Sequence, residues 1–238
     1  MSSLKTEFVS GIAYLTLDNP ESANSFGVAE SKDLQKFLKN YREPSKKKSN
    51  AKSIHGLVFQ ASPGRTFSSG GNLRFYSRLK TRQEGLAANQ QIRRALGELA
   101  AFHAPTVALV DGDCWGGGME LLSCFDFRVA TPRCQFGFWQ RRNGLSFGWG
   151  GFERWTKHSS AATVRRLALT AEPFSAYQAQ SWGIVDQITP AWRLLETAQS
   201  WLLSMKDLGS EAGSLCKTLD AKNEVKIFSR LWLNASHK

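Results

Sequence analysis

The stretch that decides the fold is Pro105–Asp126, which reads PTVALVDGDCWGGGMELLSCFD. Its apolar run Val107–Val110 predicts a buried strand. Three glycines, Gly116–Gly118, come after the strand, and Glu120 lies at the start of the next apolar segment, which is predicted to be a helix. Such a turn lets backbone N–H groups approach a ligand and favours negative charge. It indicates either an oxyanion site with an acid or base alongside, or a tight strand–helix turn whose Glu120 complements the helix dipole.

A second turn of small residues follows another predicted strand. Gly56–Gln60 is a short apolar run, and Phe67–Leu73, FSSGGNL, comes soon after it. The glycines Gly70 and Gly71 either present backbone amides to a ligand or serve only a permissive turn. Strands and helices alternate along the chain, which predicts an α/β fold with parallel crossovers. Ligands of open α/β sheets lie beyond the carboxyl ends of the strands, where both turns are expected.

Hydrophobic periodicity predicts the remaining elements. Helices are expected at Val28–Tyr41, within Arg78–His103, and at Ala161–Thr170, Ser175–Trp182 and Trp192–Met205, with a last one carrying Val225, Phe228 and Trp232. Further strands are expected at Glu7–Ser10, Ile12–Leu17, Phe127–Ala130 and Ile184–Ile188. The segment Arg42–Ser53 is polar and predicts a loop.

Composition describes an ordinary globular protein, with 42% apolar and 21% charged residues among 238. There is no apolar run of about 20 residues and no secretory signal, so no membrane span and a cytoplasmic location are predicted. The four cysteines, Cys114, Cys124, Cys134 and Cys216, match no metal-binding spacing. They are expected to be reduced and mostly buried thiols.

The chain carries a net charge of +11, and residues 32–52 alone hold eight Lys or Arg against two acidic residues. A basic surface of this kind suits nucleic acid, a membrane surface or a polyanionic small molecule. No nucleic-acid-binding motif accompanies the charge. A solvated face is therefore the favoured interpretation, and nucleic acid is an unlikely partner.

Four motifs in order resemble the crotonase family, also called the enoyl-CoA hydratase/isomerase superfamily. They are DNPESANS at 18–25, FSSGGNL at 67–73, the Pro105–Asp126 stretch and FSAYQAQSWGIVDQI at 174–188. The resemblance covers roughly residues 7–205. It implies a crotonase-like superhelix of ββα units over residues 1–190 and a C-terminal helical region over 191–238. That region mediates homotrimers, or hexamers formed from two trimers, in the family.

The resemblance also implies a ligand, which is an acyl-coenzyme A thioester. Coenzyme A enters as part of the substrate, and no separate cofactor or metal is expected. By position in the motifs, the backbone amides of Gly71 and Gly117 form the oxyanion hole, and Glu120 is the catalytic acid or base. Substrate contacts are expected from the neighbouring residues Ser69, Gly70, Asn72, Gly116 and Trp139. Arg65 and Arg74, close to the first glycine turn, are candidates for contacts to the phosphates.

Two positions depart from the family pattern. Gln140 occupies the place of the second glutamate that hydratases of the family use, and Asn72 replaces an aspartate. A glutamine can orient a water or a carbonyl, but it has no proton that titrates near neutral pH. Loss of a general acid or base typically costs about 10²- to 10⁴-fold in rate. Hydration is therefore the activity placed in doubt.

The favoured function is an acyl-CoA enzyme of hydratase/isomerase type in which Glu120 acts alone as acid or base and Gln140 assists. One carboxylate and an oxyanion hole suffice for isomerisation or for decarboxylation. The alternative is a catalytically weak or inactive acyl-CoA-binding homologue. RNA binding through residues 32–52 is supported by charge alone. The aromatic residues Phe138, Trp139, Phe147 and Trp149 either pack in the core or line an acyl pocket.

Overall fold

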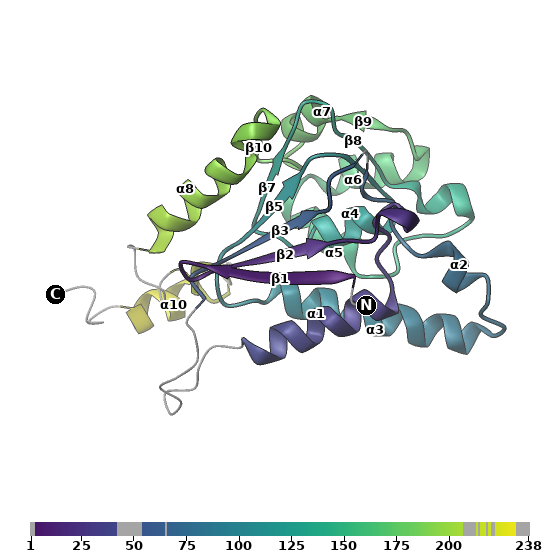
Figure 1. Ribbon diagram of the computed structural model, residues 1–238, viewed down its shortest axis with the longest axis horizontal. Coiled ribbons are helices and arrows are strands. Elements are labelled where there is room, and N and C mark those ends of the chain that lie inside the picture. The colour runs from purple at the N-terminus through teal and green to yellow at the C-terminus, as the bar shows by residue number, and fades with distance from the viewer. Residues whose placement is uncertain are drawn as a thin grey trace.

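The structure is a computed structural model that describes residues 3–41, 54–64, 66–206, 213, 215–217, 219 and 222–231. It shows an α/β fold in which a large sheet carries helices on both faces (Figure 1). The predicted fold class is therefore confirmed. The predicted loop at 42–53, Arg65 and Trp232 lie outside the described residues.

Six strands of the described chain form the large sheet, in the order β1-β2-β3-β5-β7-β10. They are β1 Leu4–Val9, β2 Ile12–Leu17, β3 Gly56–Ala61, β5 Thr106–Val110, β7 Phe127–Ala130 and β10 Gln187–Ile188. β1 runs antiparallel to β2, and the other neighbours are parallel. Parallel strands are usually covered on both faces, which explains the unbroken apolar runs in β3 and β5.

A smaller sheet holds the strands that follow those of the large sheet. Its order is β4-β6-β8-β9, with β4 Thr66–Ser68, β6 Asp113–Trp115, β8 Gln135–Gly137 and β9 Phe174–Ser175. The chain thus passes from β3 to β4, from β5 to β6 and from β7 to β8 before each next helix. This is the ββα repeat that the resemblance implied, and its second strands are too short for hydrophobic periodicity to reveal.

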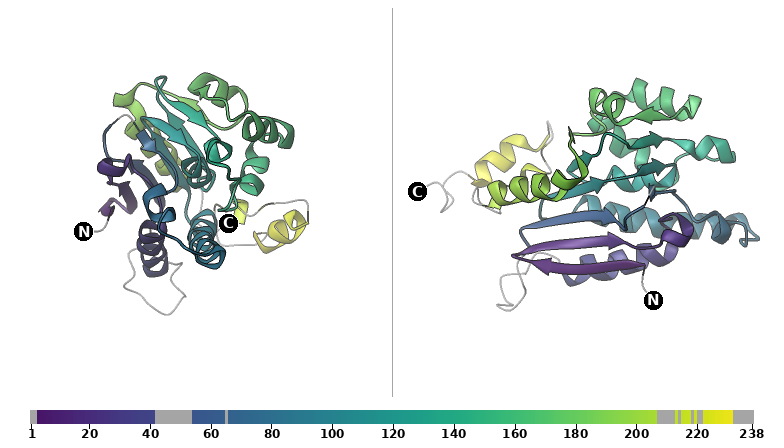
Figure 2. Two further views of the ribbon diagram at one scale, coloured as in Figure 1. Left: turned by 90° about the vertical axis from the view of Figure 1, so that its right-hand side faces the viewer. Right: turned by 45° about the horizontal axis from the view of Figure 1, so that its top comes forward.

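Most helices agree with the predicted segments. The described helices are α1 Val28–Asn40, α2 Leu73–Tyr76, α3 Arg82–Ala100, α4 Gly117–Leu122, α5 Gly151–His158, α6 Ala161–Thr170, α7 Ala176–Ser181, α8 Leu194–Lys206 and α10 Glu224–Leu231. Of these, α2 and α5 were not predicted. Short 3₁₀ turns, η1 Pro20–Ser22, η2 Trp139–Asn143 and η3 Ala191–Arg193, connect some of them. Figure 2 shows α1 and α3 side by side on one face of the large sheet.

The predicted strand at Ile184–Ile188 is shorter than expected, since only Gln187 and Ile188 pair with β7. The cause is the end of α7. Ile184 donates its N–H to the carbonyl of Ala179 at 2.8 Å, which closes the helix terminus. Ile184 and the following Val185 are then buried as core side chains.

Two hydrophobic clusters lie on opposite faces of the large sheet. In β2, Ala13 and Leu15 belong to the main core under α1 and α3, whereas Ile12 and Tyr14 belong to a smaller core under α8. This alternation follows from the two-residue period of a strand. Helix α8 covers the smaller core with an apolar stripe consisting of Leu194, Ala198 and Leu202.

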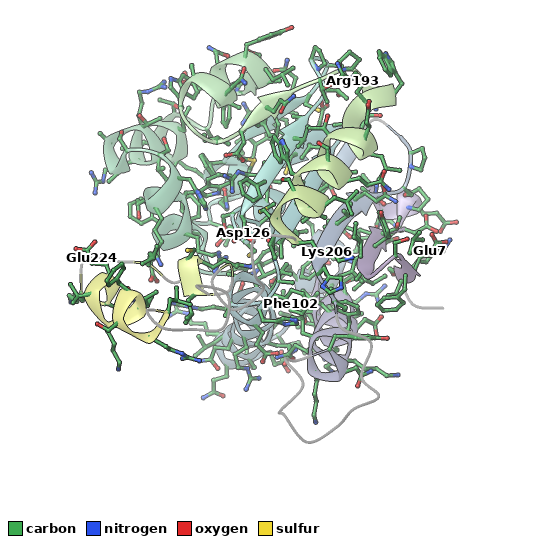
Figure 3. The ribbon with its side chains drawn as sticks, turned by 90° about the vertical axis from the view of Figure 1, so that its left-hand side faces the viewer. Glu7, Phe102, Asp126, Arg193, Lys206 and Glu224 are labelled. Carbon is green, nitrogen blue, oxygen red and sulfur yellow. The ribbon has the colours of Figure 1, made fainter. Side chains whose placement is uncertain are left out.

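The C-terminal helices lie at one end of the molecule. Figure 3 looks toward α8, which runs from near Arg193 to Lys206, with α10 near Glu224 on the other side of the view. Between these helices, Lys217 donates to the carbonyls of Phe102 and Ala104 at 2.7 and 2.8 Å. It also pairs with Asp126 at 2.8 Å. The boundary predicted between 1–190 and 191–238 stays a prediction.

Candidate active site

The two glycine turns lie against each other at the ends of β4 and β6. These strands are parallel neighbours, with Ser68 opposite Cys114, so the turns that follow them are adjacent. A Cβ atom on Gly70 would lie 2.7 Å from the carbonyl oxygen of Trp115 and 2.8 Å from the nitrogen of Gly117. Real Cβ atoms do not approach backbone so closely, and Gly70 also has a positive φ of 96°. The contact between the turns therefore requires glycine here.

The amides predicted to bind an oxyanion are close together as a result. A Cβ atom on Gly117 would lie 3.1 Å from the nitrogen of Gly71. Gly116, which precedes α4, has a positive φ of 51° and turns the chain between β6 and the helix. The structure thus brings Gly70, Gly71, Gly116 and Gly117 into one cluster, as the sequence indicated. Their binding roles stay predictions.

Glu120 projects from the first turn of α4 and is buried, with 2% of its surface exposed. Its Oε2 accepts from the amides of Trp149 at 2.8 Å and Gly151 at 2.9 Å. Its Oε1 accepts from the amide of Gly148 at 3.2 Å and from Nε2 of Gln140 at 3.3 Å. Both carboxylate oxygens are therefore engaged with donors.

The carboxylate sits at the N-terminus of α5, which begins at Gly151. The first N–H groups of a helix lack partners within it, and an anion there is stabilised by the helix dipole. The sequence indicated Glu120 as a first-turn residue that complements the dipole of its own helix, and the structure places it in the first turn of α4 and also at the N-terminus of α5. Gly151 makes this contact close, since a Cβ atom there would lie 2.5 Å from Cγ of Glu120.

Gln140 lies in η2 and contacts Glu120, so the two predicted catalytic side chains are neighbours. Its amide nitrogen faces the carboxylate, which can only accept. Its Oε1 is buried and has no hydrogen-bond partner in the structure. A buried acceptor without a partner is costly, so a donor from a ligand or a water would be stabilised at this oxygen.

Trp149 was predicted as either core or pocket, and it borders both glycine turns. Its six-membered ring lies 2.4 Å from the place of a Cβ on Gly117 and 3.5 Å from that on Gly71. Its Nε1 donates to Oδ1 of Asn89 at 2.8 Å. Tyr76 also donates to this Oδ1, at 3.2 Å. Only 4% of Trp149 is exposed.

Sequence reasoning missed Asn89 and Tyr76. A signal was present for Asn89, because it lies three residues before Ile92 and seven before Leu96, two buried positions of α3. An asparagine on the apolar stripe of a helix needs a partner, and here the partners are the donors of Trp149 and Tyr76. Burial raises the pKa of the Tyr76 hydroxyl, so this group stays a donor at neutral pH.

The remaining predicted substrate contacts have local partners. Oδ1 of Asn72 accepts from the amide of Phe75 at 3.0 Å and caps α2. The hydroxyl of Ser69 donates to the carbonyl of Ser22 at 3.1 Å. These side chains order the loop around Gly70 and Gly71. They therefore contribute to the site by fixing the loop backbone.

Trp139 belongs to a stack of rings at the carboxyl ends of β6 and β8, the two central strands of the small sheet. It stacks on Trp115 with the ring centroids 3.8 Å apart, and the Arg142 guanidinium covers it at 4.2 Å. Its Nε1 is buried without a hydrogen-bond partner. Of the other aromatic candidates, Phe138 is fully buried and Phe147 packs against the core.

The charged groups with shifted pKa values lie outside this cluster. Arg128 is buried and pairs with Asp186 at 2.9 Å. Burial and the nearby Arg128 charge lower the pKa of His158 from 6.5 to about 4. Burial also lowers the pKa of Lys217. The cysteines are free thiols, three of them buried, and burial raises the pKa of Cys124 to about 11.

A separate cavity of about 190 Å³ lies between α8 and the carboxyl ends of β3 and β5. Gln60, Thr66, Asp111 and Leu194 are among its lining residues. Its lining includes neither Glu120 nor the glycines of the two turns, so we do not place the chemistry there.

In the described part of the chain, no three His, Cys, Asp or Glu side chains are grouped to hold a metal ion. No helix among the described residues has the length and apolarity needed to cross a membrane.

The ββα repeats, the two adjacent glycine turns and the buried carboxylate of Glu120 together define a class of α/β protein. Residues 7–227 match the family model of enoyl-CoA hydratase/isomerase. The chain belongs to this family.

Known proteins agree with this assignment. The mitochondrial enoyl-CoA hydratase domain-containing protein 2 of Bos taurus is 31% identical over 176 residues, which are 74% of this chain and 57% of that protein. This chain thus spans somewhat more than half of that relative. The solved enoyl-CoA hydratase of Bacillus anthracis has a TM-score of 0.87 at 20% identity, covering 99% of this chain and 92% of the other. The human enoyl-CoA hydratase domain-containing protein 3 has a TM-score of 0.83 at 21% identity, covering 99% and 94%. At these identities the two structures show the fold alone.

Proposed function

We propose that this protein acts on acyl-CoA thioesters by stabilising a thioester enolate at the backbone amides of Gly71 and Gly117. The observation that carries the proposal is the contact between the two turns, which places these amides beside each other. Preorganised donors at a developing negative charge are among the largest contributions to catalysis. Membership in the enoyl-CoA hydratase/isomerase family supports a coenzyme A thioester as the ligand.

In this proposal Glu120 transfers the proton and Gln140 positions it. The Nε2 of Gln140 holds Oε1 of the carboxylate, while its own Oε1 is left for a donor on the substrate or a water. To accept a proton, Glu120 must give up one of its four hydrogen bonds, which come from Gly148, Trp149, Gly151 and Gln140. The weaker pair, at 3.2 and 3.3 Å, is on Oε1, which is therefore the oxygen assigned to proton transfer.

A single carboxylate favours isomerisation or decarboxylation over hydration. Decarboxylation forms the enolate without a base, and only the following protonation needs a donor. Hydration needs a second acid or base, and Gln140 has no titratable proton. Two further carboxylates near the glycine turns in the sequence have other surroundings: Glu153 is exposed on α5, and Asp113 accepts from the amide of Gln135 at 3.2 Å.

The second candidate is an acyl-CoA-binding homologue with weak or no catalysis. The four donors around Glu120 favour it, because a carboxylate that stabilises a helix N-terminus is costly to use in proton transfer. Both candidates share the ligand, with coenzyme A as part of the bound molecule and no further cofactor. A homotrimer or hexamer assembled through residues 191–238, phosphate contacts from Arg74 and a cytoplasmic location belong to the proposal as well.

The test is turnover of a panel of enoyl-CoA and carboxyacyl-CoA thioesters by the wild type, Glu120→Gln, Gln140→Glu and a control, Glu153→Gln. We expect wild-type isomerase or decarboxylase turnover that Glu120→Gln reduces by about 10²-fold or more and that Glu153→Gln preserves. Hydration is expected to rise in Gln140→Glu. Acyl-CoA binding measured by calorimetry, together with circular dichroism, confirms that Glu120→Gln is folded.

The outcomes separate the two candidates. Binding of thioesters without turnover in the wild type supports the binding homologue. Undiminished turnover in Glu120→Gln excludes Glu120 as the acid or base. Failure of every thioester to bind the folded wild type rejects both candidates.

A further inference from the structure

Two aromatic side chains lie beside the glycines that supply the paired amides. A thioester oxygen that accepts from Gly71 and Gly117 would lie about 3 Å from each nitrogen. The ring of Trp149 lies next to the Cα atoms of both glycines. A Cβ atom would lie 2.4 Å from this ring if it were added to Gly117, and 3.5 Å from it if added to Gly71. The ring of Tyr76 lies 3.3 Å from the same point on Gly71. Since the Cβ position of Gly117 also lies 3.1 Å from the nitrogen of Gly71, the indole lies beside both amides that would bind the oxygen.

The indole is held in place from several directions. The amide of Trp149 donates to Glu120 at 2.8 Å, and its carbonyl accepts from Nη2 of Arg154 at 2.9 Å. Its ring nitrogen donates to Asn89, and its ring packs on Phe26 with centroids 6.3 Å apart. Moving the side chain would break the Asn89 bond and open a buried apolar contact, so the ring acts as a fixed wall.

Asn89 holds the indole in position because it accepts hydrogen bonds from both Trp149 and Tyr76. Its Oδ1 accepts from Trp149 and Tyr76, and its own Nδ2 donates to the carbonyl of Gly85 at 2.9 Å. The last bond lies within α3 and sets the direction of the side-chain amide. Asn89 is therefore a positioning residue that acts through the two aromatic rings.

We infer that Trp149 determines acyl-chain length and restricts the site to short acyl groups, of the acetyl to butyryl class, with Asn89 holding the indole in position. The inference rests on the proposed function, since it concerns the same thioester site. A medium-length chain such as octanoyl would need the volume that the indole fills. Removal of the indole exposes apolar walls that additional methylene groups can then cover.

The test is calorimetric measurement of the dissociation constants for acetyl-CoA and octanoyl-CoA. The proteins are the wild type, Trp149→Ala and Asn89→Ala, with Trp192→Ala as the control because 78% of Trp192 is exposed. We expect the wild type to bind acetyl-CoA at least tenfold more tightly than octanoyl-CoA. Trp149→Ala should raise the affinity for octanoyl-CoA relative to acetyl-CoA at least tenfold, and Asn89→Ala about threefold. Trp192→Ala should leave the ratio unchanged.

Two results would overturn the inference alone: equal wild-type affinity for both thioesters, or a ratio that neither Trp149→Ala nor Asn89→Ala alters. If Trp149→Ala fails to fold, Trp149→Phe and Asn89→Ala decide the matter by the same ratio. Absence of any thioester binding to the folded wild type and variants would overturn the proposed function, and the inference with it.

Discussion

Gly151 is a residue at which the packing around Glu120 leaves no room for a side chain. A Cβ atom there would lie 2.5 Å from Cγ, 2.9 Å from Cβ and 3.0 Å from Cα of Glu120. The Cα atom cannot move without moving α4, so the strain is not relieved by a rotamer change. The close approach lets the Gly151 amide reach the carboxylate at 2.9 Å.

We therefore expect Gly151→Ala to destabilise the protein by about 1–3 kcal/mol, the usual cost of overpacking a core. Gly97→Ala is the matched control, because Gly97 is an exposed position of α3 with no atom within 4 Å of its absent Cβ. That variant should be neutral or stabilising by up to about 1 kcal/mol. Urea unfolding measures both, and equal stabilities of the two variants would contradict this account of the site.

Helix α5 links the candidate site at one end to a buried charge cluster at the other. It begins at Gly151 beside Glu120 and ends at His158. The ring nitrogens of His158 lie 3.4 and 3.5 Å from the guanidinium of Arg128, which pairs with Asp186. The neutral imidazole is therefore the form that the fold accommodates.

This arrangement predicts loss of stability in mild acid. The pKa of His158 falls from 6.5 to about 4 on folding, so between these values the unfolded chain binds a proton that the folded chain does not. The stability present above pH 6.5 is then lost as the pH falls toward 4. Because the ring is partly exposed, solvent screening reduces the effect, and we expect a loss of roughly 1 kcal/mol in the free energy of unfolding by about pH 5.

The measurement is urea unfolding between about pH 7 and pH 5 for the wild type and His158→Gln, which cannot titrate. The variant should lose less stability across this range. Asp186 acts in the opposite direction, because burial raises its pKa. An identical pH dependence of the two proteins would show that His158 does not cause it.

At the scale of the whole molecule, Lys217 joins the C-terminal part of the chain to the core. Its ammonium donates to two carbonyls at the end of the α3–β5 connection and pairs with Asp126, which also accepts from Thr106 at the start of β5. Three acceptors around one largely buried ammonium make this a specific attachment.

Lys217→Met should free this attachment, at a cost of about 1–3 kcal/mol for the acceptors left without a partner. Faster amide hydrogen exchange in α10 than in the wild type is expected, with little change in β2 and β3. Lys206→Met, at an exposed position at the end of α8, is the control. Unchanged exchange in α10 of Lys217→Met would mean that other contacts hold the helix.

Much of this molecule could be predicted from the order of its residues. Long periodic elements such as α1, α3 and α6 follow from their apolar stripes, and the motifs around Gly71 and Gly117 indicate that two turns meet. The partners of Glu120 could not be predicted, because Gly148, Trp149 and Gly151 donate to it through backbone amides. Almost every residue type carries a backbone amide, so the sequence does not distinguish these donors. The position of Trp149 against the two glycine turns depends on tertiary packing and could not be predicted either.

The hydrogen bonds of Glu120 couple proton transfer to the order of a helix. A carboxylate that holds the first turn of α5 loses part of its attraction for those amides whenever it takes up a proton. Each turnover through Glu120 would thus briefly loosen α5, and a substitution in α5 remote from the substrate would change the rate of proton transfer. By thermodynamic reciprocity, a ligand that holds the carboxylate ionised would rigidify α5 as far as His158.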